Sequence, residues 1–106
     1  MFQEEFAKIE TACAQIPAED DRSLMDCWER LAQLVCSHLD EAIEFMRNCT
    51  EFQAGMISSV MDDVTIRLRS RRFITALREL DHRFPQLGMG LLIEHDVRSI
   101  GDDWLD

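Results

Sequence analysis

Apolar residues recur at intervals of three and four along almost the whole chain, which is the spacing of one face of an α-helix. The first such stripe consists of Phe2, Phe6, Ile9, Cys13 and Ile16. Pro17 ends it, because a proline pushes the preceding residue out of the helical region. No stretch alternates apolar and polar residues with period two, as a half-buried strand would. The pattern therefore predicts an all-α protein.

Five further stripes follow, so the chain is expected to form about six short amphipathic helices. The residues expected to point inward are Leu24, Trp28, Leu31, Val35 and Leu39; then Ala42, Ile43 and Met46; then Phe52, Met56, Ile57, Val60, Met61, Val64 and Leu68; then Phe73, Ile74, Leu77, Leu80 and Phe84; and last Leu91, Leu92, Val97 and Ile100. The last helix is expected to begin near Leu87 or Gly88. Short connections favour antiparallel neighbours, which indicates a bundle or stacked hairpins.

Polar residues mark where the helices should begin and end. Side chains suited to N-capping are those of the Glu19-Asp20-Asp21 run, Asp40, Thr50 with Gln53 as a capping box, and Ser70. Pro85 should stop the fifth helix, and Gly101 should follow the last one. Residues 1–106 are interpreted as one helical domain with an acidic tail at 102–106. Trp104 and Leu105 in this tail are expected to dock on the body.

Charge is spread unevenly over the 106 residues, whose formal net charge is −10. Residues 1–63 hold fourteen acids and four bases, whereas residues 64–84 hold six bases and two acids. The six bases are Arg67, Arg69, Arg71, Arg72, Arg78 and Arg83. These arginines either pair within the protein, with the acidic tail or with Asp62 and Asp63, or form an anion-binding patch. The first interpretation is favoured, because no glycine-rich segment accompanies them to cradle a phosphate.

The acidic excess narrows the class of partner. A net charge of −10 should repel nucleic acid and anionic membranes, and it suits a basic protein. No apolar run approaches the roughly 20 residues of a membrane span. No signal peptide is visible at the N-terminus, and no Cys-x-x-Cys pair occurs among the four cysteines. The sequence therefore predicts a cytoplasmic protein with reduced thiols.

Few residues have the spacing of a catalytic or metal site. Glu79 and His82 have the Glu-x-x-His spacing of half a di-iron ligand set, but a second copy is missing. Cys36 and His38 lack a matching second pair, and Glu94-His95-Asp96 occupies consecutive helix positions that point in different directions. We expect no enzyme, no cofactor and no metal site.

The middle of the chain carries a family resemblance. Its elements are Asp26-Cys27-Trp28, the segment 41–49, the segment 57–64 with its Val-Met-Asp-Asp-Val run, and Ser70, Phe73-Ile74, Leu77, Leu80 and Phe84-Pro85. Together they resemble the small all-helical immunity proteins of bacterial polymorphic toxin systems. The likeness spans about residues 24–100 and is nearest to immunity proteins of contact-dependent growth inhibition that neutralise a nuclease toxin. Ser59 stands where relatives would be expected to carry an acid.

The resemblance implies a protein that binds a cognate basic toxin one-to-one and occludes its active site. Carboxylates would then take the place of nucleic-acid phosphates. The acids expected outside the apolar stripes are the candidate partner-binding residues Glu19, Asp20, Asp21, Glu51, Asp62, Asp63, Asp102 and Asp103. At least one of Asp62 and Asp63 should reach solvent. The free protein is expected to be a monomer that binds neither nucleic acid nor membranes.

Two other functions stay open at this point. One is an acidic secretion chaperone or adaptor that binds a partner through an apolar helix face. The other is an enzyme that uses His82 with Glu79. Salt dependence and oligomeric state would separate the first from the immunity function, because salt screens charge-steered binding. Metal analysis would test the second.

Overall fold

Local hydrogen bonds set where three of the helices begin. Asp20 and Ser70 each accept a hydrogen bond from the backbone N–H three residues further on, at 3.2 and 3.3 Å. Thr50 and Gln53 form the full capping box, in which each side chain accepts from the other residue's backbone N–H. These bonds satisfy N–H groups that the first turn of a helix leaves without partners. The predicted caps at these three positions are confirmed.

The computed structural model describes all residues from 1 to 106 and contains no strand, so the predicted all-α class is confirmed. Its helices are α1 (Phe2–Ala14), α2 (Asp21–Ser37), α3 (Leu39–Asn48), α4 (Glu51–Leu68), α5 (Arg71–Arg83), the 3-10 turn η1 (Pro85–Leu87) and α6 (Gly90–Ile100). Gly101 follows α6 with a φ of 61°, which confirms its predicted position at the end of the last helix.

Two predicted helix starts are wrong. His38, and not Asp40, occupies the N-cap position of α3, because His38 alone separates α2 from α3 and Asp40 already lies in the first turn. The last helix begins at Gly90 and not near Leu87. Gly88 has a φ of 67°, a left-handed conformation that ends η1 and keeps it separate from α6.

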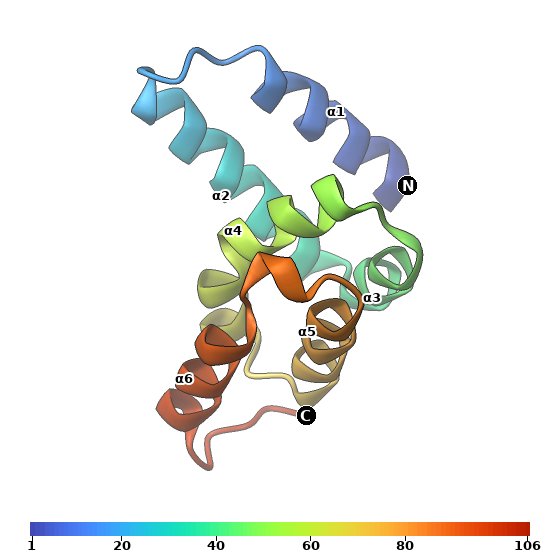
Figure 1. The fold of residues 1–106 in the computed structure, drawn as a ribbon, viewed down its shortest axis with the longest axis vertical. Helices are drawn as coiled ribbons and strands as arrows, with labels where there is room; N and C mark the ends of the chain where they lie inside the picture. The colour runs from blue at the N-terminus through green and yellow to red at the C-terminus, as the bar shows by residue number, and fades with distance from the viewer.

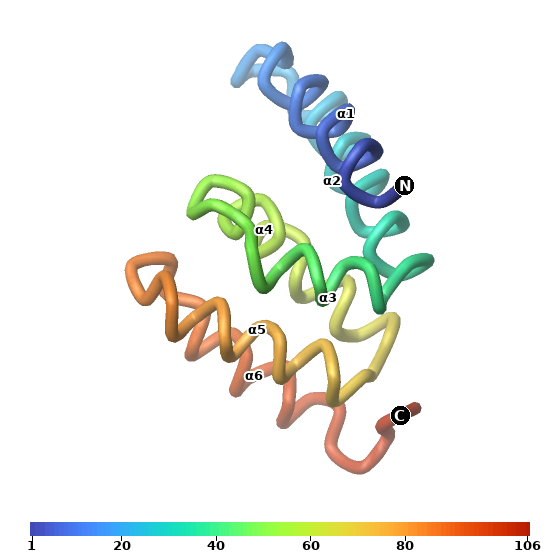
Figure 2. Tube along the Cα trace, turned by 90° about the vertical axis from the view of Figure 1, so that its right-hand side faces the viewer, coloured from blue at the N-terminus to red at the C-terminus, as the bar shows by residue number.

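Helices α2, α5 and α6 pack against α4, whereas α1 packs on α2 and α3 packs on α5 (Figure 1). The α1–α2 hairpin projects at one end of the 39 Å long axis, and α6 with the tail lies at the other end (Figures 1 and 2). Between them, α3 and α5 lie side by side. The contact between α2 and α4 and the contact between α3 and α5 are thus separate parts of the molecule.

A cluster of 23 buried residues extends through all six helices. Its aromatic part joins α1 to α3, where the rings of Phe6 and Phe45 lie 4.4 Å apart and those of Phe2 and Phe45 5.3 Å apart. Burial of one such side chain stabilises the fold by about 1.5–3 kcal/mol. Phe45 and Met89 belong to this core, although they lie outside the predicted stripes.

Three residues predicted to point inward, Phe52, Leu91 and Leu92, are exposed instead. Phe52 is 64% exposed, because each step of four residues turns by about 40°, which places Phe52 about 80° round α4 from buried Val60. Leu91 is 86% exposed and lies about 160° round α6 from buried Ile93. Leu92, also predicted inward, is 46% exposed.

The prediction that the two apolar residues of the C-terminal tail dock on the body is confirmed for Trp104 and wrong for the Leu105 side chain, which is 64% exposed. The N–H of Leu105 donates to the backbone carbonyl of Arg69 at 2.8 Å, and Trp104 packs half-buried against the core. The Asp106 carboxylate accepts from Ser70 and, at 2.7 Å, from the N–H of Arg71. These contacts tie the tail to the turn between α4 and α5.

No helix has the length and apolar character required to cross a membrane. The four cysteines are free, and Cys27 and Cys49 are buried. Burial raises the pKa of Cys36 and Cys49, so neither thiol is activated as a nucleophile.

Candidate partner-binding surface

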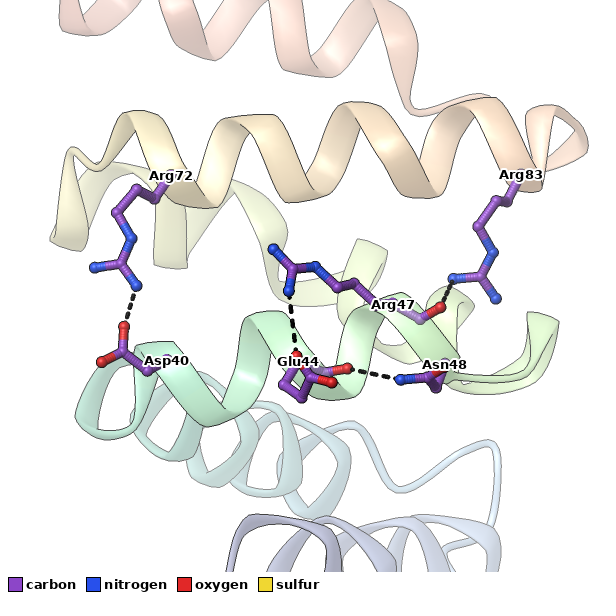
Figure 3. Close-up of polar contacts among 6 residues, drawn as sticks. All are labelled: Asp40, Glu44, Arg47, Asn48, Arg72 and Arg83. Carbon is purple, nitrogen blue, oxygen red and sulfur yellow. Dashed lines mark hydrogen bonds and ion pairs between the residues drawn. The ribbon is translucent and has the colours of Figure 1, made fainter.

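Arginines of α5 are held by α3. Arg72 forms an ion pair with Asp40, at the start of α3 (Figure 3). Arg83, at the other end of α5, donates to the carbonyls of Met46, Arg47 and Cys49 at 2.7, 2.9 and 2.8 Å. These three carbonyls end α3, so the guanidinium satisfies groups that the helix leaves open.

The other arginines of the basic segment are also engaged, except for the side chain of Arg69. Arg67 bridges Asp63 of its own helix at 2.7 Å and Glu29 of α2 at 2.6 Å. The hydrogen bond from Arg67 lowers the pKa of Glu29. Arg78 pairs with Glu94, and Arg71 lies 5.2 Å from the ring centroid of Trp104. The predicted intramolecular pairing is therefore confirmed for Arg67 with Asp63 and for Arg71 with the tail. Arg72 and Arg78 pair instead with Asp40 and Glu94, which were not among the predicted partners.

The candidate acids do not form one cluster. Glu19, Asp20 and Asp21 lie at the tip of the α1–α2 hairpin, whereas Asp102 and Asp103 follow α6 at the opposite end (Figure 1). Asp20 is committed to capping α2. A compact partner site cannot include both ends of the molecule.

The remaining three candidates lie along α4. Glu51 is exposed at its start and accepts a hydrogen bond from Gln86 at 2.8 Å. Asp62 and Asp63 are both exposed, which confirms that at least one of them reaches solvent. Asp63 is paired with Arg67, whereas Asp62 has no Lys or Arg partner. Glu51 and Asp62 lie eleven positions apart and therefore on nearly the same side of the helix.

Beside this line of acids lies an apolar groove of about 590 Å³, which we call the α2–α4 groove. Its lining residues are Trp28, Glu51, Phe52, Gly55, Met56, Ser59 and Leu87. A smaller depression of about 210 Å³ adjoins it and shares Trp28 and Ser59. The depression is lined further by Met25, Glu29, Val60 and Asp63.

The groove and the depression together form one surface, which we call the α2–α4 surface. Carboxylates lie at both of its ends. Glu51 lies at one end, and Glu29 with Asp63 lies at the other. No lysine or arginine is among the lining residues. The arrangement therefore combines exposed apolar area with negative charge, which suits recognition of a basic protein surface.

Asp96, the last residue of the Glu94-His95-Asp96 trio, is buried. The residue is 4% exposed on the inner face of α6, and its Oδ2 has no hydrogen-bond partner. The pKa of Asp96 is raised to about 6, mainly because the carboxyl group is buried and in addition because the carboxylate of Asp62 lies close to it. The spacing of Ile93, Asp96 and Ile100 on one helix face was the available signal for this burial.

The residues considered for catalysis lie apart from this surface. Glu79 and His82 are both exposed on α5. Nowhere do three or more His, Cys, Asp or Glu side chains come together in a way that could hold a metal ion. The apolar groove and its carboxylates are thus the feature that suggests a function.

The fold and this surface define an all-α protein with an apolar groove between carboxylates. No family model, no curated protein and no solved structure matches the chain. The resemblance to immunity proteins consequently rests on the residues of this chain and stays a prediction.

Proposed function

We propose that this protein is a cytoplasmic inhibitor of the immunity type, which binds a cognate basic toxin domain one-to-one and neutralises it. The observation that supports the proposal is the α2–α4 groove, where exposed apolar side chains lie between carboxylates and no cation lines the surface. The free protein would be a monomer with no catalytic activity.

The charge of the protein suits a nuclease as the toxin. A nuclease must present lysine and arginine to hold phosphates. The carboxylates of Glu51 and Asp62, neither of which pairs with Lys or Arg, can engage such cations in place of phosphate. A net charge of −10 also steers a cationic partner and can raise association rates by about 10- to 1,000-fold.

The test is co-purification with the C-terminal domain of the protein encoded by the adjacent upstream gene. We expect an equimolar complex in which the toxicity of that domain is suppressed. If the domain is a nuclease, the complex should also suppress its nuclease activity. Association should weaken between low and high salt, because screening removes the steering. Absence of a complex at low salt, or a complex that leaves the toxin active, contradicts the proposal.

A second candidate is an adaptor or secretion chaperone, which the exposed Leu91 and Leu92 at the start of α6 favour. Such a protein would bind through apolar contact, and its affinity would change little with salt. It would also be expected as a dimer. Sedimentation of the free protein, and titration of its partner at two salt concentrations, separate the two functions.

A further inference from the structure

The α2–α4 groove leaves a large aromatic side chain in solvent. Phe52 is 64% exposed at the edge of the groove, and Met25, in the adjoining depression, is 69% exposed. We propose that this surface receives an amphipathic helix of the partner, with an apolar stripe that carries lysine or arginine at both ends. This inference rests on the proposed function, since the same partner would supply the helix.

The shape of the groove suits a close approach. Gly55 and Ser59, one turn apart on α4, are the smallest lining residues. Trp28 from α2 and Leu87 from η1 flank them. Apolar anchors that enter a pocket between larger side chains contribute most of the binding energy in such interfaces.

The length of the surface matches several helical turns. Glu51 and Asp63, at its two ends, are twelve positions apart on α4, which corresponds to about 18 Å of helix. A partner helix laid along α4 would need about twelve residues to cover this distance. The protein has no strand, so an extended peptide finds no sheet edge with which to pair.

The charges select the ends of the partner helix. Three carboxylates and no cation line the surface, and Arg67 neutralises only part of the pair formed by Glu29 and Asp63. Asp62, next to that pair in the sequence, adds a charge without a Lys or Arg partner. Both ends of the surface are therefore negative, and lysine or arginine complements each of them. A second copy of this chain would bring further carboxylates to the same ends.

The experiment uses designed peptides and the full chain labelled with ¹⁵N. One peptide of about 18 residues has a leucine stripe with lysines at both ends, and its matched control carries glutamates instead. We expect the lysine peptide to shift the amide resonances of residues 25–29 and 51–63, with an affinity that falls at high salt. The glutamate peptide should bind at least about tenfold more weakly.

A matched pair of variants locates the binding. Ser59→Arg places a long charged side chain on the exposed middle of the surface, whereas Thr11→Arg adds the same charge on exposed α1. Circular dichroism should show that both variants fold. Ser59→Arg should weaken peptide binding at least about tenfold, and Thr11→Arg should leave it unchanged within about twofold.

Several results would overturn the inference. These are peptide shifts outside the two segments, equal binding of both peptides, equal effects of both variants, and no binding at millimolar peptide. Dimerisation that Ser59→Arg abolishes would assign the groove to a second copy instead. If the toxin complex forms unchanged with Ser59→Arg, the groove inference fails while the proposed function stands. If the lysine peptide binds the groove but the toxin is not inhibited, the proposed function fails while the groove inference stands.

Discussion

The α3–α5 interface and the α2–α4 surface both combine charged with apolar side chains, but they use their charges differently. At the α3–α5 interface, Arg72 pairs with Asp40 and Arg83 donates to the carbonyl of Arg47 (Figure 3). Arg83 also donates to the carbonyls of Met46 and Cys49. On the α2–α4 surface, carboxylates line the groove without a cation among the lining residues. The charges of the α3–α5 interface are paired within the protein. On the α2–α4 surface Glu29 and Asp63 share Arg67, whereas Glu51 and Asp62 pair with no Lys or Arg and are available to a partner.

The apolar residues of the two regions show the same contrast. Phe73 of α5 is fully buried, whereas Phe52 of α4 is 64% exposed. An exposed aromatic side chain gives up the stabilisation that its burial would bring. The fold therefore leaves this stabilisation unused on the α2–α4 surface, where a binding partner could recover it.

The largest expected effect compares these two phenylalanines. Phe73→Ala should lower the free energy of unfolding by about 3–5 kcal/mol, because it leaves a cavity in the core. Phe52→Ala removes the same atoms and should change the free energy by less than about 0.5 kcal/mol. Urea unfolding followed by circular dichroism measures both. If Phe73→Ala does not fold, Phe73→Leu serves, and equal losses at positions 52 and 73 would refute the contrast.

The next prediction concerns Arg83, which donates to three carbonyls at the end of α3. Arg83→Ala should cost about 2 kcal/mol, because these acceptors lose a charged donor. The control is Arg98→Ala, at an exposed position of α6, which should cost less than about 0.5 kcal/mol. Urea unfolding of the two variants side by side measures the difference. Equal stability of the two would show that the α3–α5 contact does not stabilise the fold.

Buried Asp96 predicts a dependence of stability on pH. Its pKa is raised to about 6, so the folded protein binds a proton more tightly than the unfolded chain. Its unfavourable contribution is absent at low pH, develops from about pH 4 to 6, and is complete above that. Asp96→Asn should therefore raise the free energy of unfolding at pH 7 by about 1–2 kcal/mol.

The measurement for Asp96 is urea unfolding of both proteins at several pH values from 4 to 7.5. The free energy of unfolding of Asp96→Asn minus that of the unsubstituted protein should grow as pH rises through this range and then level off. Asp102→Asn, at an exposed position, is the control and should show no such trend. A pH-independent difference for Asp96→Asn would contradict the assignment.

A smaller effect is expected for charge reversal beside the groove. Asp62→Lys should slow association with the basic partner about tenfold, which corresponds to about 1.4 kcal/mol. Asp63 is left in place because it holds Arg67. Asp102→Lys makes the same change at the far end of the molecule and should have less effect. Stopped-flow association at two salt concentrations tests this, and equal slowing by both variants would show that only net charge matters.

The smallest effect is expected at Gly55. A Cβ added there would lie 3.9 Å from Cδ2 of Leu87, which is an ordinary contact. Gly55→Ala should stabilise α4 by about 0.5–1 kcal/mol, because alanine loses less backbone entropy than glycine. Thermal unfolding measures the gain. Partner binding should weaken slightly at the same time, since the groove becomes shallower, and a loss of stability would show that the groove floor tolerates no side chain.

The parts of the fold that could be predicted depend on residues close together in the sequence. The caps at Asp20, Thr50 and Ser70 close their hydrogen bonds within three residues, and a sequence pattern can detect them. Phe52 and Leu91 were misplaced, because a stripe defined only by spacing does not show how far a helix turns away from the core.

The candidate site could be predicted only in part. Glu51, Asp62 and Asp63 were found as exposed acids of one helix, but the groove beside them depends on Trp28 of α2 and Leu87 of η1. Neither spacing nor charge indicates that these two residues, distant in the sequence, line one groove together with Gly55. The sequence does not show the distances between helices. It therefore could not separate the three acids on α4 from Glu19, Asp20 and Asp21 at one end of the molecule and Asp102 and Asp103 at the other.

The docked tail has a consequence for how the protein opens. The bond between the N–H of Leu105 and the carbonyl of Arg69 closes a loop that contains α5, η1 and α6. The Asp106 carboxylate accepts hydrogen bonds from Ser70 and Arg71 at the start of α5. If the tail detaches, the start of α5 loses these bonds and becomes exposed to solvent. We therefore expect residues 69–106 to unfold as one cooperative unit, with the amide hydrogen of Leu105 exchanging no faster than those in the first turns of α5.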